Sequence, residues 1–113
     1  MKKNIFYILA FFFLFIIKPV NAQKIDLCRV FGNFYVTTDK NLADFRVHIE
    51  ETEGLADLLV YQQKNKFYAD KAGQWYITPN KKEADFWIYF EPLKGYANFS
   101  ISYTETESFA GCK

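Results

Sequence analysis

Hydrophobic and polar residues alternate along several short stretches of this chain, and each stretch follows an alanine and a short polar residue. In the clearest case, Phe45, Val47 and Ile49 share one face of an extended segment while polar residues occupy the other. Segments 85–90 and 98–103 repeat the pattern. Alternation with a period of two is typical of a half-buried strand. We therefore expect strands of five to seven residues, and no helix in residues 23–113.

The alanines that precede these strands recur at spacings of 13, 13, 15, 13 and 13 residues. Each unit reads strand, turn, bulky residue, alanine, and the offset of residues 34–37 implies one further strand upstream. The unit from 69 to 84 departs from the pattern, because residues 71–74 delay its strand to Trp75–Ile77. The repeated corner residues are Ala43, Asp44, Ala56, Asp57, Ala69, Asp70, Ala84, Asp85, Ala97, Asn98, Ala110 and Gly111.

A period of thirteen is odd, whereas side chains alternate with a period of two, so each corner must reset which face points inward. This disfavours continuous parallel coils, and the chain lacks the ladders of identical residues that a regular parallel β-helix would stack. Short strands that reverse or cross at each corner fit better. The alanine would let backbones approach closely there, and the Asp or Asn would bond nearby amides as in an Asx turn.

The N-terminal segment has the pattern of an export signal. Lys2 and Lys3 precede an apolar run of thirteen residues, 5–17, which is shorter than the roughly 20 residues that cross a bilayer core. Ala22 then supplies the small residue that signal peptidase requires. We expect residues 1–22 to be a cleaved signal peptide, residues 23–113 to form one domain, and the product to be secreted or periplasmic without stable membrane insertion. An uncleaved anchor is the alternative.

Cleavage after Ala22 would leave eleven basic and thirteen acidic side chains, a net charge of −2. Because nucleic-acid binding normally needs a clustered basic face, we expect no nucleic-acid partner. We also expect the protein to be a monomer. A domain of 91 residues buries only about 60–65% of its unfolded surface. Cys28 and Cys112 lie near its two ends, so in an oxidising compartment we expect them to form a disulfide, with two buried thiols as the alternative.

The repeated Ala-Asp-apolar-x-Val/Ile-Tyr/Phe pattern, the strand at 74–78 and the Ala110-Gly111 ending resemble the septoil-knot domain family. Its members are small proteins of unknown function whose backbone is tied in a seven-crossing torus knot. The resemblance covers roughly residues 28–113 and implies an all-β single small domain of short strands that wind around one another, an exception to the rule that connections do not thread. Asn98 and Gly111 stand where Asp is usual, and the two cysteines, which relatives need not share, could clamp the tails.

The recurring acids Asp44, Asp57, Asp70 and Asp85 could suggest a catalytic or calcium site. Residues that recur once per structural unit usually serve the fold, and calcium loops gather several oxygens in one glycine-containing loop. The chain has one histidine, His48, which we expect on a strand surface, and no nucleophile elbow, phosphate loop or Cys-x-x-Cys motif. We therefore expect structural corners, and no enzymatic activity, metal or cofactor.

Aromatic residues are abundant, at 17 of the 91 residues after Ala22. Trp87 and Tyr89 cannot share a strand face with Ile88, so either the winding covers both faces or one aromatic set is exposed. An exposed Trp87–Tyr89 platform, with Trp75 and Tyr76 as further candidates, could bind a cell-surface glycan or a protein. The sequence favours a secreted, non-enzymatic structural or interaction module that resists unfolding, and the alternative is a carbohydrate- or protein-binding module.

Overall fold

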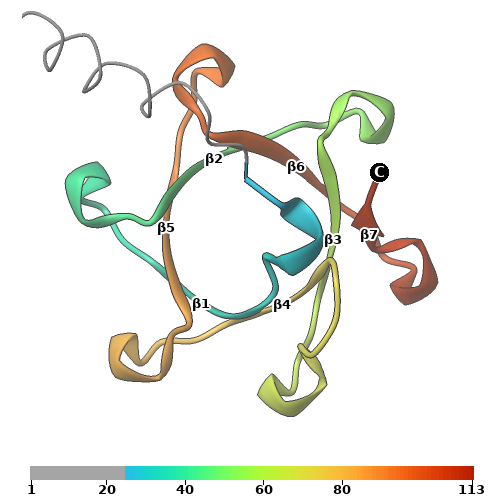
Figure 1. The fold of residues 1–113 in the computed structure, drawn as a ribbon, viewed down its shortest axis with the longest axis horizontal. Coiled ribbons are helices and arrows are strands. Elements are labelled where there is room, and N and C mark those ends of the chain that lie inside the picture. Colours follow the sequence, from blue (N-terminus) through green and yellow to red (C-terminus); the bar gives the residue numbers. More distant parts are fainter. Residues whose placement is uncertain (1–24) are drawn as a thin grey trace, which may run out of the picture.

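The computed structural model describes residues 25–113, in which six short parallel strands form a closed ring (Figure 1). The predicted signal peptide lies outside the described residues. The strands are β1 (Gly32–Val36), β2 (Phe45–Ile49), β3 (Leu58–Gln62), β4 (Gln74–Ile77), β5 (Phe86–Phe90) and β6 (Phe99–Tyr103). A seventh strand, β7 (Gly111–Cys112), pairs antiparallel with the start of β3. The prediction of an all-β single small domain is confirmed.

Strands that follow one another in sequence are mostly not neighbours in the ring. The order is β4-β1-β5-β2-β6-β3, and β3 pairs with β4 to close it. β5 therefore lies between β1 and β2, and β6 lies between β2 and β3. The chain passes round the ring and then, from β4 onward, passes round again, laying its later strands between the earlier ones (Figure 1).

Neighbouring strands consequently pair residues that are far apart in sequence. Gly32 is opposite Trp75, a separation of 43 residues, and Phe34 is opposite Phe86, a separation of 52. A regular parallel β-helix would instead stack each unit on the next one in sequence. The structure thus pairs units that belong to different passages of the chain round the ring.

The linkers explain why the expected strand reversals do not occur. Strands β1 to β6 all run the same way, and only β7 reverses. Between strands the chain leaves the ring, makes one turn of 3-10 helix and returns in the same direction (Figure 1). The 3-10 turns, which the sequence analysis did not anticipate, are η3 (Lys40–Leu42), η4 (Glu53–Leu55), η5 (Lys66–Tyr68), η6 (Lys81–Glu83), η7 (Lys94–Tyr96) and η8 (Glu107–Phe109).

Asx residues begin several of these turns, although they are not the corner residues. The side chains of Asp39, Asn65 and Asn80 each accept a hydrogen bond of 3.0 Å from the amide two residues further along. Such side-chain caps satisfy amides that a single helical turn leaves without an intrahelical partner. In these three excursions a polar residue at the start therefore helps to fix the shape of the turn.

The corners reset the inward face, as the odd repeat predicts. Phe34, Val47 and Val60 follow one another at intervals of thirteen residues, and each is 0% exposed inside the ring. Phe34 also stacks on Trp75, with ring centroids 3.9 Å apart. The interior is filled by Val30, Phe34, Val47, Leu58, Val60, Trp75, Ile88, Phe99 and Ile101. At roughly 25 cal/mol per Å² of apolar area, burial of these side chains is the main source of stability.

The N-terminal segment covers one end of this core. The 3-10 turn η2 (Leu27–Arg29) lies within the ring outline next to β3 in Figure 1, and the residue that follows, Val30, is 4% exposed. Its carbonyl accepts a hydrogen bond of 2.9 Å from the indole Nε1–H of Trp75. A buried indole N–H needs such a partner, so this segment both covers the core and provides the acceptor for its largest side chain, Trp75.

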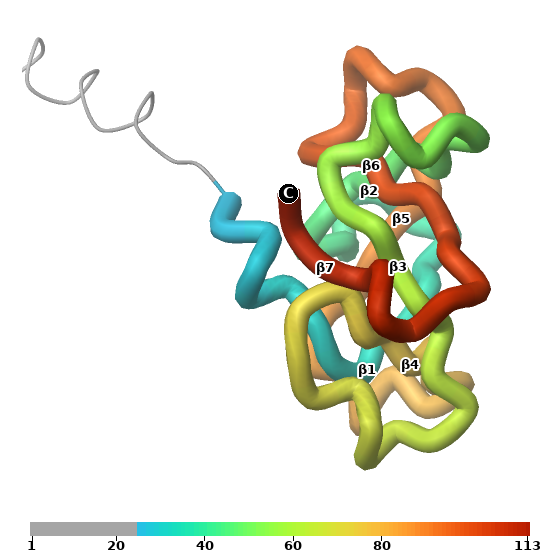
Figure 2. Tube along the Cα trace, turned by 90° about the vertical axis from the view of Figure 1, so that its right-hand side faces the viewer, coloured from blue at the N-terminus to red at the C-terminus, as the bar shows by residue number. Residues whose placement is uncertain are grey.

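The two ends of the domain meet on the same face of the ring (Figure 2). There a disulfide joins Cys28, in η2, to Cys112, in β7, with their Cα atoms 5.1 Å apart. The bond agrees with the expected pairing, and it links residues separated by 84 positions. In the chain-entropy picture, closing a loop of that length stabilises the fold by about 4–5 kcal/mol.

The ring closes where the repeat departs from its usual length. Only two residue pairs connect β3 to β4, whereas the other strands of the ring pair through three. Just before β4, Gly73 has φ +78°, and a Cβ there would overlap the backbone nitrogen of Gly111 and the carbonyl oxygen of Leu59. The extra residues of the 69–84 unit thus bring a glycine to a crowded junction of β3, β4 and β7.

Gly73→Ala should lower the free energy of unfolding by at least about 2 kcal/mol, because it combines a disfavoured positive φ with overlap against two backbone segments. Gly54→Ala is the matched control, since a Cβ there meets no atom within 4 Å, and its effect should stay within about 0.5 kcal/mol. Urea denaturation of both variants measures the difference. Equal stability of the two variants would contradict the described junction.

Candidate functional site

Four of the corner residues hold a distant strand by two hydrogen bonds, an arrangement that we call a corner clasp. Asp44 accepts a hydrogen bond of 2.8 Å from the amide of Trp87 at Oδ2, and its own amide donates to the Trp87 carbonyl at 2.7 Å. The other three clasps join Asp85 to Asn33, Asn98 to Arg46, and Asp57 to Ser100, with both bonds of each between 2.7 and 3.0 Å. Each clasp joins residues that are 43 or 52 positions apart.

The clasps use the corner side chains differently from the expected Asx turn, because the amide that each side chain accepts from belongs to another strand. Asn98 does the same as the acids, since only an acceptor oxygen is needed. Gly32 leaves room for one clasp, because a Cβ there would overlap the Asp85 carboxylate. The carboxylates are thus distributed around the ring and accept hydrogen bonds from the backbone. This arrangement favours a structural role over a common catalytic or calcium site.

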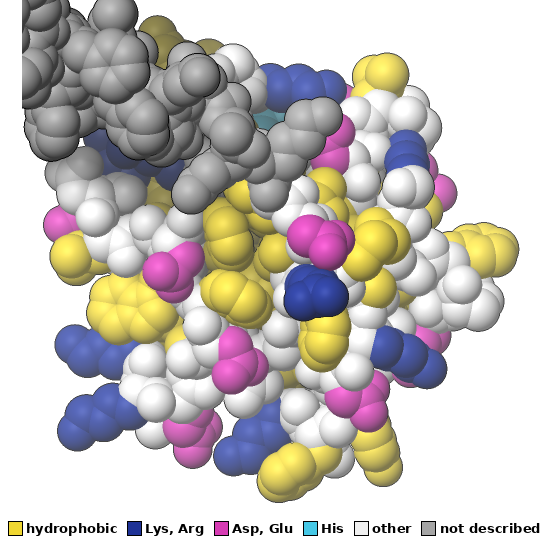
Figure 3. Space-filling model, in the orientation of Figure 1, with side chains coloured by type: hydrophobic (Ala, Val, Ile, Leu, Met, Phe, Trp, Pro, Cys, Tyr) yellow, Lys and Arg dark blue, Asp and Glu magenta, His cyan; other side chains and the backbone are white. Residues whose placement is uncertain are grey.

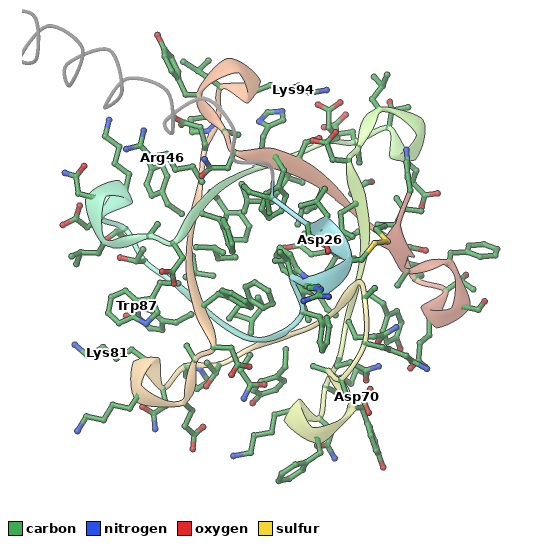
Figure 4. The ribbon with its side chains drawn as sticks, in the orientation of Figure 1. Asp26, Arg46, Asp70, Lys81, Trp87 and Lys94 are labelled. Atoms are coloured by element: carbon green, nitrogen blue, oxygen red, sulfur yellow. A yellow bond between two sulfur atoms is a disulfide. The ribbon has the colours of Figure 1, made fainter. Side chains whose placement is uncertain are left out.

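Two corners depart from the clasp, and both belong to units next to the junction of β3 and β4. Asp70 (Figure 4) lies exposed in its loop, and its side chain makes no hydrogen bond with the rest of residues 25–113. Gly111 has no side chain to offer. At this junction a cluster of polar side chains stands in place of the clasps. The Gln63 side-chain amide donates to the side-chain oxygens of Gln74 and Glu107. The Gln74 side chain is 2% exposed and donates to the Glu107 carbonyl.

The aromatic candidates separate into one core residue and three outer residues. Trp75 is 0% exposed and lies inside the ring, so its assignment as a binding residue is wrong. Alternation along β4 places Trp75 and Tyr76 on opposite faces, and the structure shows that Trp75 is the one inside. Tyr76, Trp87 and Tyr89 are half-buried on the outer face.

On the outer face, Trp87 pairs with an aromatic residue that the sequence analysis did not connect to it. The rings of Tyr35 and Trp87 have centroids 5.0 Å apart and are tilted by 57°. Trp87 points away from the centre of the ring (Figure 4) and lines a shallow depression together with Leu42 and Asp44. Tyr35 and Trp87 are strand partners 52 residues apart, so only the interleaving of β1 and β5 reveals the pair.

Tyr89 lies two positions further along β5 but lines a separate depression, with His48, Ile49, Phe90, Glu91 and Pro92. The Trp87–Tyr89 pair therefore does not form one continuous platform. The outer aromatic pair of this face is Tyr35–Trp87, which becomes the candidate binding site.

His48 is less exposed than expected, because its side chain joins a polar chain that runs across three segments. The ring Nδ1 lies 2.9 Å from the Glu91 carbonyl, and Nε2 lies 3.2 Å from a Glu50 carboxylate oxygen. The other Glu50 oxygen lies 3.3 Å from Lys94 Nζ. The His48 side chain is only 18% exposed, and each of its two ring nitrogens lies within 3.2 Å of an oxygen atom. This arrangement links β2 to the loop after β5 and leaves neither nitrogen free for a ligand.

Tyr103, at the end of β6, is a half-buried tyrosine. Burial raises the pKa of its hydroxyl, and a hydrogen bond with Gln62 partly offsets that rise. Both residues line a depression with Tyr61, Lys64 and Glu105. The shift keeps Tyr103 neutral and gives no reactive group at ordinary pH.

The tips of the loops carry exposed apolar side chains. The residue before the corner alanine is Leu42, Leu55, Tyr68, Tyr96 or Phe109 in five units, with exposures between 59% and 67%, and Glu83 in the sixth. In Figure 3, apolar side chains project at the periphery of the visible face, and charges of both signs lie between them. Because the loops radiate outward, these residues point in different directions and form no single apolar patch.

A closed parallel ring around which the chain passes twice, with later strands laid between earlier ones, defines a knotted all-β domain. Residues 27–113 match the family model of the 7(1) septoil knot domain, and the chain belongs to that family. The predicted family is thereby confirmed. No curated protein matches the chain. Within residues 25–113 no helix is long and apolar enough to cross a membrane, and no group of three or more potential metal-ligating His, Cys, Asp or Glu side chains comes together.

Asp57→Ala should lower the free energy of unfolding by about 1–2 kcal/mol, because the amide of Ser100 loses a charged acceptor. Asp57→Asn should lose less than half as much, since an amide oxygen makes the same contact at Asn98. Asp70→Ala, which breaks no clasp, should stay within about 0.5 kcal/mol. Chemical denaturation compares the three variants, and an Asp70 effect as large as that of Asp57 would refute the structural account of the corners.

Proposed function

We propose that this protein is an exported, non-catalytic module whose role depends on staying folded where proteases and mechanical stress act on it. The observation that carries the proposal is the disulfide that joins the two ends of a ring already closed by strand pairing. The N-terminal export pattern supports the proposal, because it would take the chain to an oxidising compartment, where disulfides persist.

The arrangement of the loops supports this proposal. Each loop leaves the ring and returns to it within a short segment, and four corners are held to a distant strand by clasps. Proteases generally need a stretch of chain to open locally before they cut it. A loop tethered at both ends opens less readily than a free tail, so the exposed tips need not be weak points.

Chymotrypsin gives a stringent test, because it prefers aromatic residues and three loop tips expose Phe67 (75%), Tyr96 (67%) and Phe109 (63%). We expect the oxidised protein to survive at least about tenfold longer than the Cys28→Ser/Cys112→Ser variant, since loss of the cross-link raises the open population. Gel electrophoresis of timed digests measures both half-lives. Cutting of the oxidised protein at these tips as fast as in free peptides of the same sequence would refute the proposal.

A second candidate function is glycan binding at the Tyr35–Trp87 pair. The pair offers aromatic surface on the outside of the ring, and the Asp44 carboxylate lies in the same depression. Asp44 Oδ2 accepts from the Trp87 amide, while Oδ1 accepts no hydrogen bond from residues 25–113. A sugar ring stacked on the indole could donate a hydroxyl hydrogen bond to that oxygen.

Tryptophan fluorescence reports directly on this candidate, because Trp75 is fully buried and an added ligand can reach only Trp87. We expect a saturable change on titration with peptidoglycan fragments or with oligosaccharides of an array. Tyr35→Ala should weaken that binding by roughly threefold to tenfold, as expected for loss of one aromatic contact. Phe109→Ala, at the tip of η8 on the opposite side of the ring, should leave it unchanged. No response to any glycan, or equal responses in both variants, would exclude this site.

A further inference from the structure

The disulfide encloses all of the winding of the chain. Cys28 precedes the first strand of the ring, and Cys112 lies in β7, after the last one. Of the residues that the structure describes, only 25–27 and Lys113 lie outside the loop that the bond closes. Every passage of one segment past another therefore lies inside a single covalent circle.

The position of the disulfide preserves the winding of the chain. Both tails emerge on one face of the ring (Figure 2), and the disulfide joins η2, which lies inside the ring outline next to β3, to β7, which lies outside β3 (Figure 4). The bond thus closes the circle on the side where the tails already leave the ring. Joining two tails on the face where both emerge gives a closed circle with the same crossings as the open chain.

A closed covalent circle cannot change its crossings unless a bond breaks. We infer that the Cys28–Cys112 disulfide is a topological lock: once formed on the native fold it prevents unfolding from untying the chain, and formed too early it prevents the chain from folding. Closing the lock converts two thiols into a disulfide with release of two protons, and the two electrons pass to an oxidant such as oxidised glutathione. A dithiol reductant reverses the reaction. The inference depends on the winding and the bond, and not on the proposed function.

The lock implies two products with the same mass and the same covalent bonds. A chain oxidised after folding is a knotted circle, and it stays knotted in denaturant. A chain oxidised while unfolded is an untied circle in nearly all molecules, because a random chain of this length rarely ties itself. The untied circle cannot reach the native ring, since the interleaving of β1, β5 and β2 requires a free end to pass.

The experiment compares these two circles. One sample is the natively folded, oxidised protein, transferred to concentrated guanidinium chloride without reductant. The other is the same full chain made by chemical synthesis, never folded, and oxidised with glutathione disulfide in the same denaturant. On dilution into buffer, we expect the first to recover the near-ultraviolet circular dichroism of the native protein. The second should recover it only after dithiothreitol is added.

The Cys28→Ser/Cys112→Ser variant, synthesised and unfolded in the same way, is the control, and it should fold on dilution because its ends are free. Should that variant fail to fold, electrophoresis of the two circles in denaturant decides, because a knotted circle is more compact and migrates faster than an untied one. Recovery of native signal by both circles without reductant, or equal migration in denaturant, would overturn the inference.

Discussion

Strand pairing between the two passages of the chain sets the arrangement on which the rest of this domain, including its buried core, depends. In the ring, β1 pairs with β4 and β5, β2 with β5 and β6, and β3 with β6, so each of these contacts joins an earlier strand to a later one. The junction of β3 with β4 is the one place in residues 25–113 where consecutive strands pair, and it is the shortest of the six pairings that make up the ring. The corner clasps extend the same cross-passage bonding beyond the strands. Little of the ring can therefore form before the second passage is in place, which favours cooperative folding.

The sequence predicted the units but not their partners. Spacings of thirteen residues showed the strands, and their odd value showed that the corners reset the inward face, as Phe34, Val47 and Val60 confirm. Alternation says which residues of a strand share a face, but it carries no information on which strand lies beside it. The separations of 43 and 52 residues follow from the interleaving, and the family resemblance indicated a winding without giving the strand order. The parallel direction was missed because it depends on excursions whose 3-10 turns are set by capping residues such as Asn65 and Asn80.

The candidate site was predicted in part for the same reason. Trp87 and Tyr89 lie on the outer face, but the ring that pairs with Trp87 is Tyr35, from a distant strand. Trp75 could not be told from Trp87 by pattern alone, because its burial depends on a cover supplied by Val30 and on a hydrogen bond across 45 residues. His48 likewise gained one of its partners, the Glu91 carbonyl, from a loop 43 residues away. Each of these wrong or incomplete predictions concerns a contact between the two passages of the chain. The alternation of residues within one strand carries no information about such contacts.

Closure of the ring also bears on association between molecules. Exposed edge strands are templates for strand addition and aggregation, and a closed ring removes them. In the described part of this chain the remaining edge is that of β7, which is two residues long and is followed by Lys113. The lysine ammonium donates to the carbonyl oxygens of Glu53 and Gly54, at 2.9 and 3.1 Å, and so holds the end of the chain against a neighbouring loop. In a domain rich in aromatic and β-branched residues, closure of the ring thereby leaves little exposed edge on which amyloid-like stacking could begin.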